Sequence, residues 1–375
     1  MARSLSNRWT LSAVACLVAV GYFAGCNGGG TSDPGTNDPT GPAPGGTAFL
    51  SMGTSPIGGT FPIVGDAIAQ TLNTHKGENN WKVQAKGTKG SQENIRGLDK
   101  GTLQLALSNS AISYFAFRGE SSWEQKYDIR AIVTMAPNVA MFVAKADSGI
   151  KSIADLKGKR VVIGPAGAGF EMFVGPILEE HGVKLSDIEK VNQPQGPAVD
   201  MLGDGSADAA FLGGAMPAAA ISQACASYET IFVPFDPEVR QRLIDKYPFF
   251  HAITIPGGTY QGHEEPFDGL NVGSMHVITA ASTDEELVYQ LTKTTWENRA
   301  EIAAKHGAGK AINEKNAARY TGTEFHPGAI RFYKEAGIWP ESESDSVSKS
   351  ADDAKAKAPV EKVDGKAPAE TSDSN

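Results

Sequence analysis

The segment from Ser51 to Asn94 contains two turns rich in glycine and hydroxyl side chains, and these turns constrain the fold more than any other feature. The first reads Ser-Met-Gly-Thr-Ser-Pro-Ile-Gly-Gly-Thr-Phe over residues 51–61, and the second reads Gly-Thr-Lys-Gly-Ser-Gln-Glu-Asn over residues 87–94. Each lies between an apolar run typical of a strand and a run with helical spacing. A helix that begins in this way offers unpaired backbone N–H groups and a partial positive charge. The two turns therefore predict a cradle for an anion.

The surrounding sequence alternates between strand-like and helix-like runs. Its apolar pattern predicts strands at Ala48–Met52, Trp81–Ala85, Leu103–Leu107, Ile129–Thr134 and Val139–Ala144, and helices at Ile63–Leu72 and Gln92–Lys100. This order predicts an α/β fold with a mostly parallel sheet. Ligands bind outside the carboxyl ends of the strands in such sheets, and the small polar residues that follow the predicted strands fall at that position.

A second unit with the same pattern starts near Ile150. The strand Val161–Ile163 leads into a glycine-rich turn over residues 164–170 and then into a helix from Glu171 to His181. A later strand closes at Gly-Gly-Ala-Met-Pro, residues 213–217. A second cradle in a second lobe predicts that a ligand is held from two sides and buried when the lobes close.

The start of the chain reads as an export signal over residues 1–25. Arg3 and Arg8 precede an apolar run from Leu11 to Phe23, which has the length of the apolar part of a signal peptide and is too short to span a bilayer. Phe-Ala-Gly-Cys at residues 23–26 resembles the lipobox of bacterial lipoproteins, in which cleavage leaves Cys26 as a lipid-bearing first residue. Leucine is usual where Phe23 stands, and the alternative is an ordinary signal peptide that contains a cysteine.

The two ends of the remaining chain have compositions typical of disorder. Residues 27–46 are almost entirely Gly, Pro, Thr, Asp and Asn, which predicts a flexible tether after Cys26. Residues 341–375 are rich in Ser, Ala, Lys, Asp and Glu, which predicts a disordered tail. The foldable body is then about residues 47–340, a length that suggests two domains or lobes.

Composition argues against several classes of function. The net charge of −9 argues against nucleic acid as a partner. Cys16 would be removed with the signal peptide and Cys26 would carry lipid, so Cys225 has no disulfide partner and is predicted to be a buried small hydrophobe. The seven histidines have no metal-binding spacing, and Gly-x-Ser-x-Gly and a lysine-bearing P-loop are both missing. We therefore expect no metal, no cofactor and no catalytic residues.

Short motifs in the body occur in the order found in one known family. They are Gly-Gly-Thr-Phe-Pro at 58–62, Gly-Ser-Gln-Glu-Asn at 90–94, Asp-Ala-Ala-Phe and Gly-Ala-Met-Pro within 208–217, Tyr-Pro-Phe-Phe and Gly-Gly-Thr-Tyr within 247–260, and Phe-His-Pro-Gly-Ala at 325–329. Through this ordered set, from about Phe49 to Gly337, the chain resembles the TAXI group of solute-binding proteins that serve TRAP (tripartite ATP-independent periplasmic) transporters. Each motif alone is weakly specific, and Phe61 replaces the family's usual tyrosine.

The resemblance implies a two-lobed receptor of the type II periplasmic binding-protein fold, with hinge strands between the lobes. The first lobe would span residues 47–137 and 273–340, the second would span residues 138–272, and the hinge would lie near Asn138 and Asn271. Members of the family are not enzymes. They bind a small carboxylate, such as a dicarboxylate, glutamate or a 2-oxo acid, and deliver it to a membrane permease. For this chain the resemblance implies a periplasmic lipoprotein, anchored to the membrane through Cys26.

The candidate ligand-binding residues lie in the turns of both predicted lobes. In the first lobe they are Thr54, Ser55, Gly59, Thr60, Phe61, Ser91, Asn94, Ser108, Asn109 and Ser110. In the second lobe they are Gly167, Ala168, Gly169, Phe170, Glu171, Gly214, Pro217 and Tyr260. A structural alternative stands beside each: the glycines can form tight turns, Ser91 and Asn94 can cap a helix, and Tyr260 can be a core residue.

The second-lobe turn departs from the family pattern. The family commonly has Gly-Ser-Gly-Thr where this chain has Gly-Ala-Gly-Phe at residues 167–170, so two hydroxyl donors are missing and an aromatic ring is added. Glu171 follows directly, and its carboxylate would repel a second anionic group. From this we expect a ligand with one carboxylate and a less polar or cationic second end.

Two other function classes remain open from the sequence. A ligand-sensing lipoprotein that signals to a membrane histidine kinase would have the same fold and site. An exported enzyme acting on an anionic substrate would need an acid–base pair in the cleft, where Glu171 is the nearest candidate.

Overall fold

The computed structural model describes residues 47–56 and 59–340, which form part of one compact unit of the chain. Several predictions concern residues outside these ranges. They are the signal peptide over residues 1–25, Cys26 with its tether up to residue 46, Gly58 of the opening motif, and the tail from residue 341 onward.

The first of two sheets, which we call sheet A, begins the described chain. Its strands are β1 (Ala48–Gly53), β2 (Trp81–Lys86), β3 (Leu105–Asn109), β4 (Ile129–Thr134) and β12 (Met275–Ala280), in the order β2-β1-β3-β12-β4. Strand β1 runs parallel to both β2 and β3, whereas β12 runs antiparallel to β3 and β4. All five residues of β3 are buried, as expected for a central strand with helices on both faces.

The second sheet, sheet B, lies in the middle of the chain. Its strands are β5 (Val139–Lys145), β6 (Arg160–Val162), β7 (Glu189–Val191), β8 (Ala209–Gly214), β9 (Thr230–Phe232), β10 (Phe250–Ile255) and β11 (Phe267–Val272). The order is β10-β11-β5-β8-β6-β7, and β9 pairs with β5. Its helices are α4 (Glu171–Glu180), α5 (Gln195–Asp204), α6 (Ala219–Ser227) and α7 (Pro237–Lys246). Short 3-10 turns occur at Ala146–Ser148, Ile153–Leu156 and Leu185–Asp187.

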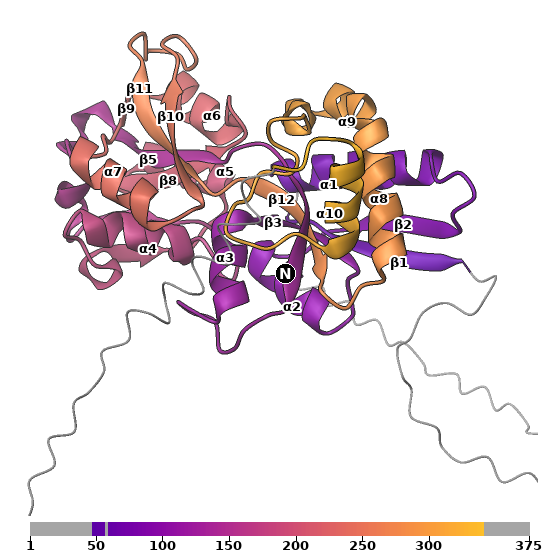
Figure 1. The fold of residues 1–375 in the computed structure, drawn as a ribbon. Helices are drawn as coiled ribbons and strands as arrows, with labels where there is room; N and C mark the ends of the chain where they lie inside the picture. Colours follow the sequence, from indigo (N-terminus) through magenta and orange to yellow (C-terminus); the bar gives the residue numbers. More distant parts are fainter. Residues whose placement is uncertain (1–46, 57–58, 341–375) are drawn as a thin grey trace, which may run out of the picture. The chain divides into compact units, whose positions relative to one another are not determined.

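Two hydrophobic cores hold the helices against the sheets. One packs α1 (Thr60–Thr74), α8 (Glu285–Glu297), α9 (Arg299–Lys305) and α10 (Pro327–Glu335) against sheet A, and Figure 1 shows α1, α8 and α10 alongside its strands. The other contains α2 (Ser91–Asp99), α3 (Ser110–Arg118) and the interior of sheet B. A 3-10 turn at Gly307–Ala311 follows α9. The second core therefore continues from one sheet to the other through α2 and α3.

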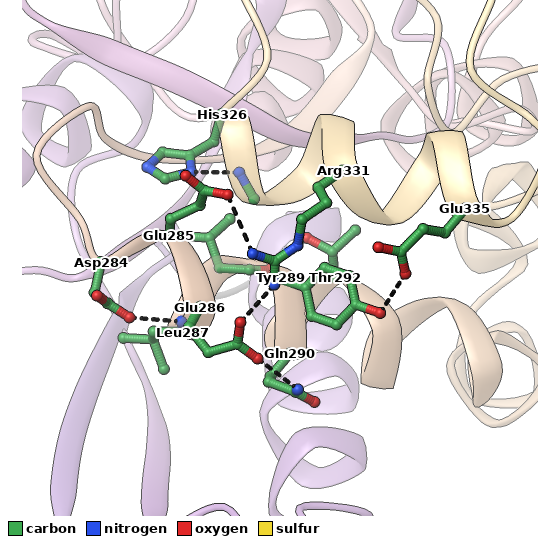
Figure 2. A network of polar contacts seen from close by, with 12 residues as sticks. Asp284, Glu285, Glu286, Leu287, Tyr289, Gln290, Thr292, His326, Arg331 and Glu335 are labelled. Carbon is green, nitrogen blue, oxygen red and sulfur yellow. Dashed lines mark hydrogen bonds and ion pairs between the residues drawn. The ribbon is translucent and has the colours of Figure 1, made fainter.

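The pairing of α8 with α10 is fixed on its exposed side by polar contacts (Figure 2). Arg331 of α10 donates hydrogen bonds to Glu285 and Glu286 at the start of α8, and its guanidinium lies 4.0 Å from the centre of the Tyr289 ring. Exposed ion pairs contribute at most about 1 kcal/mol each. We therefore regard these contacts as orienting α10 on α8, while the buried apolar faces of the two helices supply the stability.

The chain passes between the two sheets twice. It leaves sheet A after Thr134 and enters sheet B at Val139, and it leaves sheet B after Val272 and re-enters sheet A at Met275. Residues 135–138 and 273–274 are thus the two connecting segments. We call sheet A with its helices lobe 1, and sheet B with its helices lobe 2. The predicted fold class, α/β with two lobes, is confirmed.

The prediction of a mostly parallel sheet was wrong. Six of the ten pairings among the described strands are antiparallel, and they involve the strands next to the connecting segments. A chain that crosses into a second sheet and returns must run back along the first one. The returning strands β11 and β12 therefore run antiparallel to their neighbours.

Helix α3 was missed, and the end of β3 was misplaced. Leu103–Leu107 was predicted as the strand, but β3 runs from Leu105 to Asn109, and α3 begins at once with Ser110. No loop is needed because the Asn109 side chain accepts a hydrogen bond from Ala111 N at 2.8 Å and so caps the helix.

Candidate ligand-binding site

Helices begin just beyond the carboxyl ends of strands in both lobes. In lobe 1, β1, β2 and β3 are followed by α1, α2 and α3, and in lobe 2, β6, β7 and β8 are followed by α4, α5 and α6. Three close approaches show that these ends face each other. A Cβ atom on Gly90 would lie 3.5 Å from Cβ of Ala168, one on Gly169 would lie 2.9 Å from Ile112, and one on Gly214 would lie 3.9 Å from Thr60 Oγ1. The structure therefore brings the glycine-rich turns of the two lobes into contact.

The N-termini of α1 and α2 keep their backbone donors available. Their N-cap residues are Gly59 and Gly90, and no side chain among the described residues caps either helix. The first turn of α1 contains no acidic residue, whereas α2 has Glu93, whose carboxylate accepts a hydrogen bond from Lys89 N. Within the described part of the chain both helix ends present unpaired N–H groups, and α1 carries the less compensated partial positive charge.

Two buried serine hydroxyls lie beside these helix ends. Ser91, the first residue of α2, accepts a hydrogen bond from Asn109 N at 3.0 Å, so its own hydroxyl hydrogen is available to an acceptor. Ser110, the first residue of α3, is fully buried, and its Oγ has no hydrogen-bond partner among the described residues. A buried hydroxyl without a partner is costly, and a bound acceptor would relieve that cost.

Asn109 bonds Ser91 and is followed by Ser110, but its side chain makes hydrogen bonds within the protein. Its Nδ2 atom donates to the carbonyl oxygens of Gly273, at 3.0 Å, and Val272, at 3.4 Å, while Oδ1 caps α3. Asn271 in turn accepts hydrogen bonds from Asn138 N at 3.0 Å and Gly273 N at 3.2 Å. These two asparagines connect both interlobe segments to the start of α3.

Thr54 and Asn94 join the strand ends of lobe 1. Thr54 Oγ1 donates to Lys86 O at 2.9 Å, and Asn94 Nδ2 donates to Thr54 O at 2.8 Å and to Leu107 O at 2.7 Å. Both residues are buried. These bonds, all made within lobe 1, position the turns that lead into α1, α2 and α3.

Ser108 begins a buried hydrogen-bonded chain under α3. Ser113 Oγ donates to Ser108 Oγ at 2.8 Å, and His276 Nε2 lies 2.8 Å from Ser113 Oγ. Burial lowers the pKa of His276 to about 3, so the ring is neutral at pH 7. All three residues are fully buried, and a substrate therefore has no access to this serine–histidine contact.

The remaining predicted residues of lobe 1 lie at the start of α1. Ser55 is half-buried and its Oγ bonds Pro56 O, Gly59 is exposed, and Thr60 and Phe61 are half-buried. Phe61 packs against the core of lobe 1. In lobe 2, Gly167 and Pro217 are exposed, and Gly214 is half-buried at the end of β8.

Two aromatic residues of lobe 2 are packed into that lobe. A Cβ atom on Gly164 would lie 2.6 Å from the Phe170 ring, and this ring centre lies 5.1 Å from that of Phe173. Tyr260 is buried, its hydroxyl oxygen accepts a hydrogen bond from Ala218 N at 2.9 Å, and burial raises the pKa of Tyr260. The Tyr260 hydroxyl thus fixes the start of α6.

Glu171 has a cationic partner that the sequence did not indicate. Its Oε1 atom lies 2.5 Å from Nζ of Lys190, on strand β7. Both side chains are partly exposed, at 42% for Glu171 and 39% for Lys190. The sequence-based expectation that Glu171 repels a second anionic group assumed that its charge is uncompensated. The ion pair with Lys190 shows that this assumption does not hold.

Sequence reasoning missed two side-chain amides, those of Asn192 and Gln195, which lie beyond the carboxyl ends of the strands of sheet B. Asn192 Nδ2 donates to Gly164 O at 3.0 Å, and Gln195 Oε1 accepts a hydrogen bond from Gly213 N at 2.9 Å. Both follow β7, just as Ser91 and Ser110 follow their strands. The strand–turn–helix spacing around Val191 was the one signal that pointed to them.

Metal, membrane and thiol features do not add to the site. No group of three or more metal-ligating side chains occurs among the described residues, and none of the helices in that part of the chain is long and apolar enough to span a membrane. Cys225 is buried, as predicted, and burial raises the pKa of its thiol. The arrangement offers donors for a ligand and buries its hydrogen-bonded serine–histidine pair.

Several solved structures match this chain over most of its length, at low sequence identity and low TM-score. The aliphatic sulphonate binding protein SsuA from Escherichia coli is 14% identical with a TM-score of 0.38, and the match covers 83% of this chain and 92% of that chain. A putative L-cystine ABC transporter from Listeria monocytogenes is 14% identical with a TM-score of 0.43, covering 75% and 99%. A periplasmic substrate-binding protein from Coxiella burnetii is 11% identical with a TM-score of 0.41, covering 70% and 98%. Similarity at this level carries no information about the ligand.

The family assignment comes from the sequence match. Residues 52–337, which are most of the chain and include both lobes, match the NMT1-like family. The matched range includes both sets of glycine-rich turns and both connecting segments. The chain therefore belongs to the NMT1-like family.

Proposed function

We propose that the protein is an extracytoplasmic solute receptor that binds a small carboxylate between its lobes and delivers it to a TRAP-type membrane permease. The observation that carries this proposal is that α1 and α2 begin without side-chain caps at the place where lobe 1 meets lobe 2. Helix N-termini of this kind bind carboxylates through backbone N–H groups.

The serine hydroxyls complete the carboxylate site. Ser91 has a hydroxyl hydrogen to donate, and Ser110 has a buried hydroxyl that needs a partner. Hydrogen bonds to a charged group contribute about 1.5–3 kcal/mol each, and micromolar affinity corresponds to about 8 kcal/mol. A few such donors in a closed cleft are therefore enough for a receptor that must also release its ligand.

Lobe closure follows from the same contacts. Gly90 and Ala168 face each other across the lobes, so a ligand held on both sides stabilises the closed state by its higher affinity for that state. Export, a lipid anchor at Cys26 and the TRAP permease as partner are part of this proposal. They rest on the lipobox-like segment and on the ordered motifs of the sequence.

The ligand class can be tested with the purified protein. Native mass spectrometry of the protein should show a small molecule that is released by unfolding and whose mass and fragmentation identify a carboxylic acid. Isothermal titration calorimetry with that acid should then give one site per chain. A released molecule without a carboxylate would contradict the proposal. Uptake by vesicles that contain the permease should require the protein, and uptake without it would contradict the delivery role.

A further inference from the structure

We propose that Gln195 of lobe 2 binds the second polar group of the ligand, and that this group is an oxygen acceptor such as a carboxylate or carbonyl. This inference rests on the proposed function. It names the residue that selects among small carboxylates and the chemistry that it selects for.

The position of Gln195 is the first argument. It is the first residue of α5, four positions after β7 ends at Val191, and its Oε1 atom accepts a hydrogen bond from Gly213 N at 2.9 Å. Gly214 follows Gly213 and is the point at which β8 comes close to lobe 1. A Cβ atom on Gly214 would lie 3.9 Å from Thr60 Oγ1. The Gln195 amide is therefore held one residue away from the place where lobe 2 meets the start of α1.

The orientation of the amide is the second argument. A backbone N–H requires an acceptor, so the amide atom that faces Gly213 N must be the oxygen. The Nε2 atom then carries two donors in a fixed direction, and within residues 47–56 and 59–340 no acceptor bonds to it. Gln195 is half-buried, so part of its side chain is accessible.

The charges around Gln195 favour an oxygen-rich group. Lys190 compensates Glu171, and the first turn of α5 contains no acidic residue and has no side-chain cap. Asn192 uses its Nδ2 donor on Gly164 O within lobe 2. At this edge of sheet B the Gln195 amide therefore offers an oriented side-chain donor, and amide donors discriminate against a ligand that presents a methyl group there.

A structural role for Gln195 can be separated from ligand binding. Gln195→Glu keeps an oxygen to accept the Gly213 hydrogen bond but replaces the Nε2 donors with a second carboxylate oxygen. Gln195→Met removes the donor without adding charge. Gln193→Glu is the matched control, because Gln193 is exposed two residues earlier and receives the same charge. Thermal unfolding of each variant establishes that it is folded.

The probes are matched pairs that differ in the second end of the molecule. They are L-glutamate with L-norvaline, 2-oxoglutarate with 2-oxopentanoate, and succinate with butyrate. Binding to the wild type should favour the dicarboxylate of at least one pair by about tenfold or more. Gln195→Glu should reduce that preference at least tenfold and change the affinity for the monocarboxylate less than threefold. Gln195→Met should reduce the preference to a smaller extent, and Gln193→Glu should retain it.

The outcomes separate the two proposals. If the wild type binds none of the six probes, the proposed carboxylate function fails together with this inference. If the wild type prefers a dicarboxylate and Gln195→Glu keeps that preference, or weakens both members of the pair equally, the role of Gln195 is wrong and the carboxylate site stands. A wild type that prefers the monocarboxylate in each pair that binds also overturns the inference.

Discussion

The Nδ2 atom of Asn109 donates a hydrogen bond to the carbonyl oxygen of Gly273, 3.0 Å away. The bond joins the start of α3, at the candidate site, to the segment in which the chain returns from lobe 2 to lobe 1. Asn109 N also bonds Ser91 Oγ at the start of α2. The ligand-facing helix ends and one interlobe connection are therefore linked through a single side chain and its own backbone.

Gly273→Ala should destabilise the protein strongly. Gly273 has φ +114°, a conformation that disfavours a side chain, and a Cβ atom there would lie 2.2 Å from Asn109 Oδ1. Strain of this kind costs on the order of 1–3 kcal/mol, and the clash also breaks the Asn109 contacts. We expect the free energy of unfolding, measured with denaturant, to fall by about 3 kcal/mol.

The matched control for this change is Gly101→Ala. Gly101 also has a positive φ, of +67°, but a Cβ atom there would meet nothing within 4 Å. Gly101→Ala should lower the free energy of unfolding by only about 1 kcal/mol. If both variants lose the same free energy of unfolding, backbone strain alone explains the effect of Gly273→Ala and the contact with Asn109 does not contribute.

Ala168→Leu should hold the lobes apart. Ala168 is buried, and even a Cβ atom added to Gly90 would be in van der Waals contact with it, so a longer side chain has no space when the lobes are closed. We expect the variant to lose its bound small molecule in native mass spectrometry and to show a larger radius of gyration by small-angle scattering. Ala166→Leu, in the same turn but exposed, should behave as the wild type. Full retention of ligand by Ala168→Leu would argue against closure at this point.

The glycine-rich turns were predictable from the sequence because local chemistry defines them. The spacing around residues 87–94 placed α2 within one residue of its observed start at Ser91, and the turn at residues 164–170 does lead into α4 at Glu171. That these turns meet across the lobes, at Gly90 and Ala168, follows from tertiary packing that a single sequence does not contain.

Side-chain directions could not be predicted for the same reason. Phe170 is a candidate ligand-binding residue in the sequence, but in the structure its ring packs on Gly164, which has no Cβ to exclude it. Glu171 was treated as an uncompensated charge, since Lys190 lies nineteen positions away in the sequence and pairs with it only in the folded sheet. The spacing around Val191 was the one signal for Gln195, and it does not define the orientation of the side chain, which depends on Gly213, eighteen positions later.

Ser110→Ala should weaken ligand binding without weakening the fold. The Ser110 hydroxyl is fully buried and has no partner among the described residues, so its removal takes away a desolvation cost in the free protein and a donor in the complex. We expect about a tenfold increase in Kd by calorimetry and an unchanged or slightly higher Tm. Ser113→Ala should instead lower the Tm and leave the Kd unchanged, because Ser113 bonds both Ser108 and His276 beneath the site. A lower Tm for Ser110→Ala with normal affinity would assign Ser110 to the framework.

Stability should decrease in mild acid because the buried His276 and the half-buried His251 resist protonation in the folded state. Burial lowers the pKa of His276 to about 3, and burial together with the nearby Arg319 lowers the pKa of His251 to about 4. Above about pH 6.5 each ring is neutral in both states, and no stability is lost. As the pH falls below 6.5, the unfolded chain gains protons that the folded chain cannot accept. Each histidine then costs about 1.4 kcal/mol per pH unit until its folded pKa is reached.

His276→Gln removes one of these two groups and tests the assignment. Denaturant unfolding at pH 7 and pH 5 gives the stability lost over this range for the wild type and the variant. The variant should lose about 2 kcal/mol less than the wild type, whatever its stability at pH 7, because about 1.5 pH units of proton linkage are removed. His251→Gln should give a loss of similar size, and it provides the test if the buried His276 variant does not fold. If the stability lost between pH 7 and pH 5 is the same in the wild type and both variants, other groups cause the acid sensitivity.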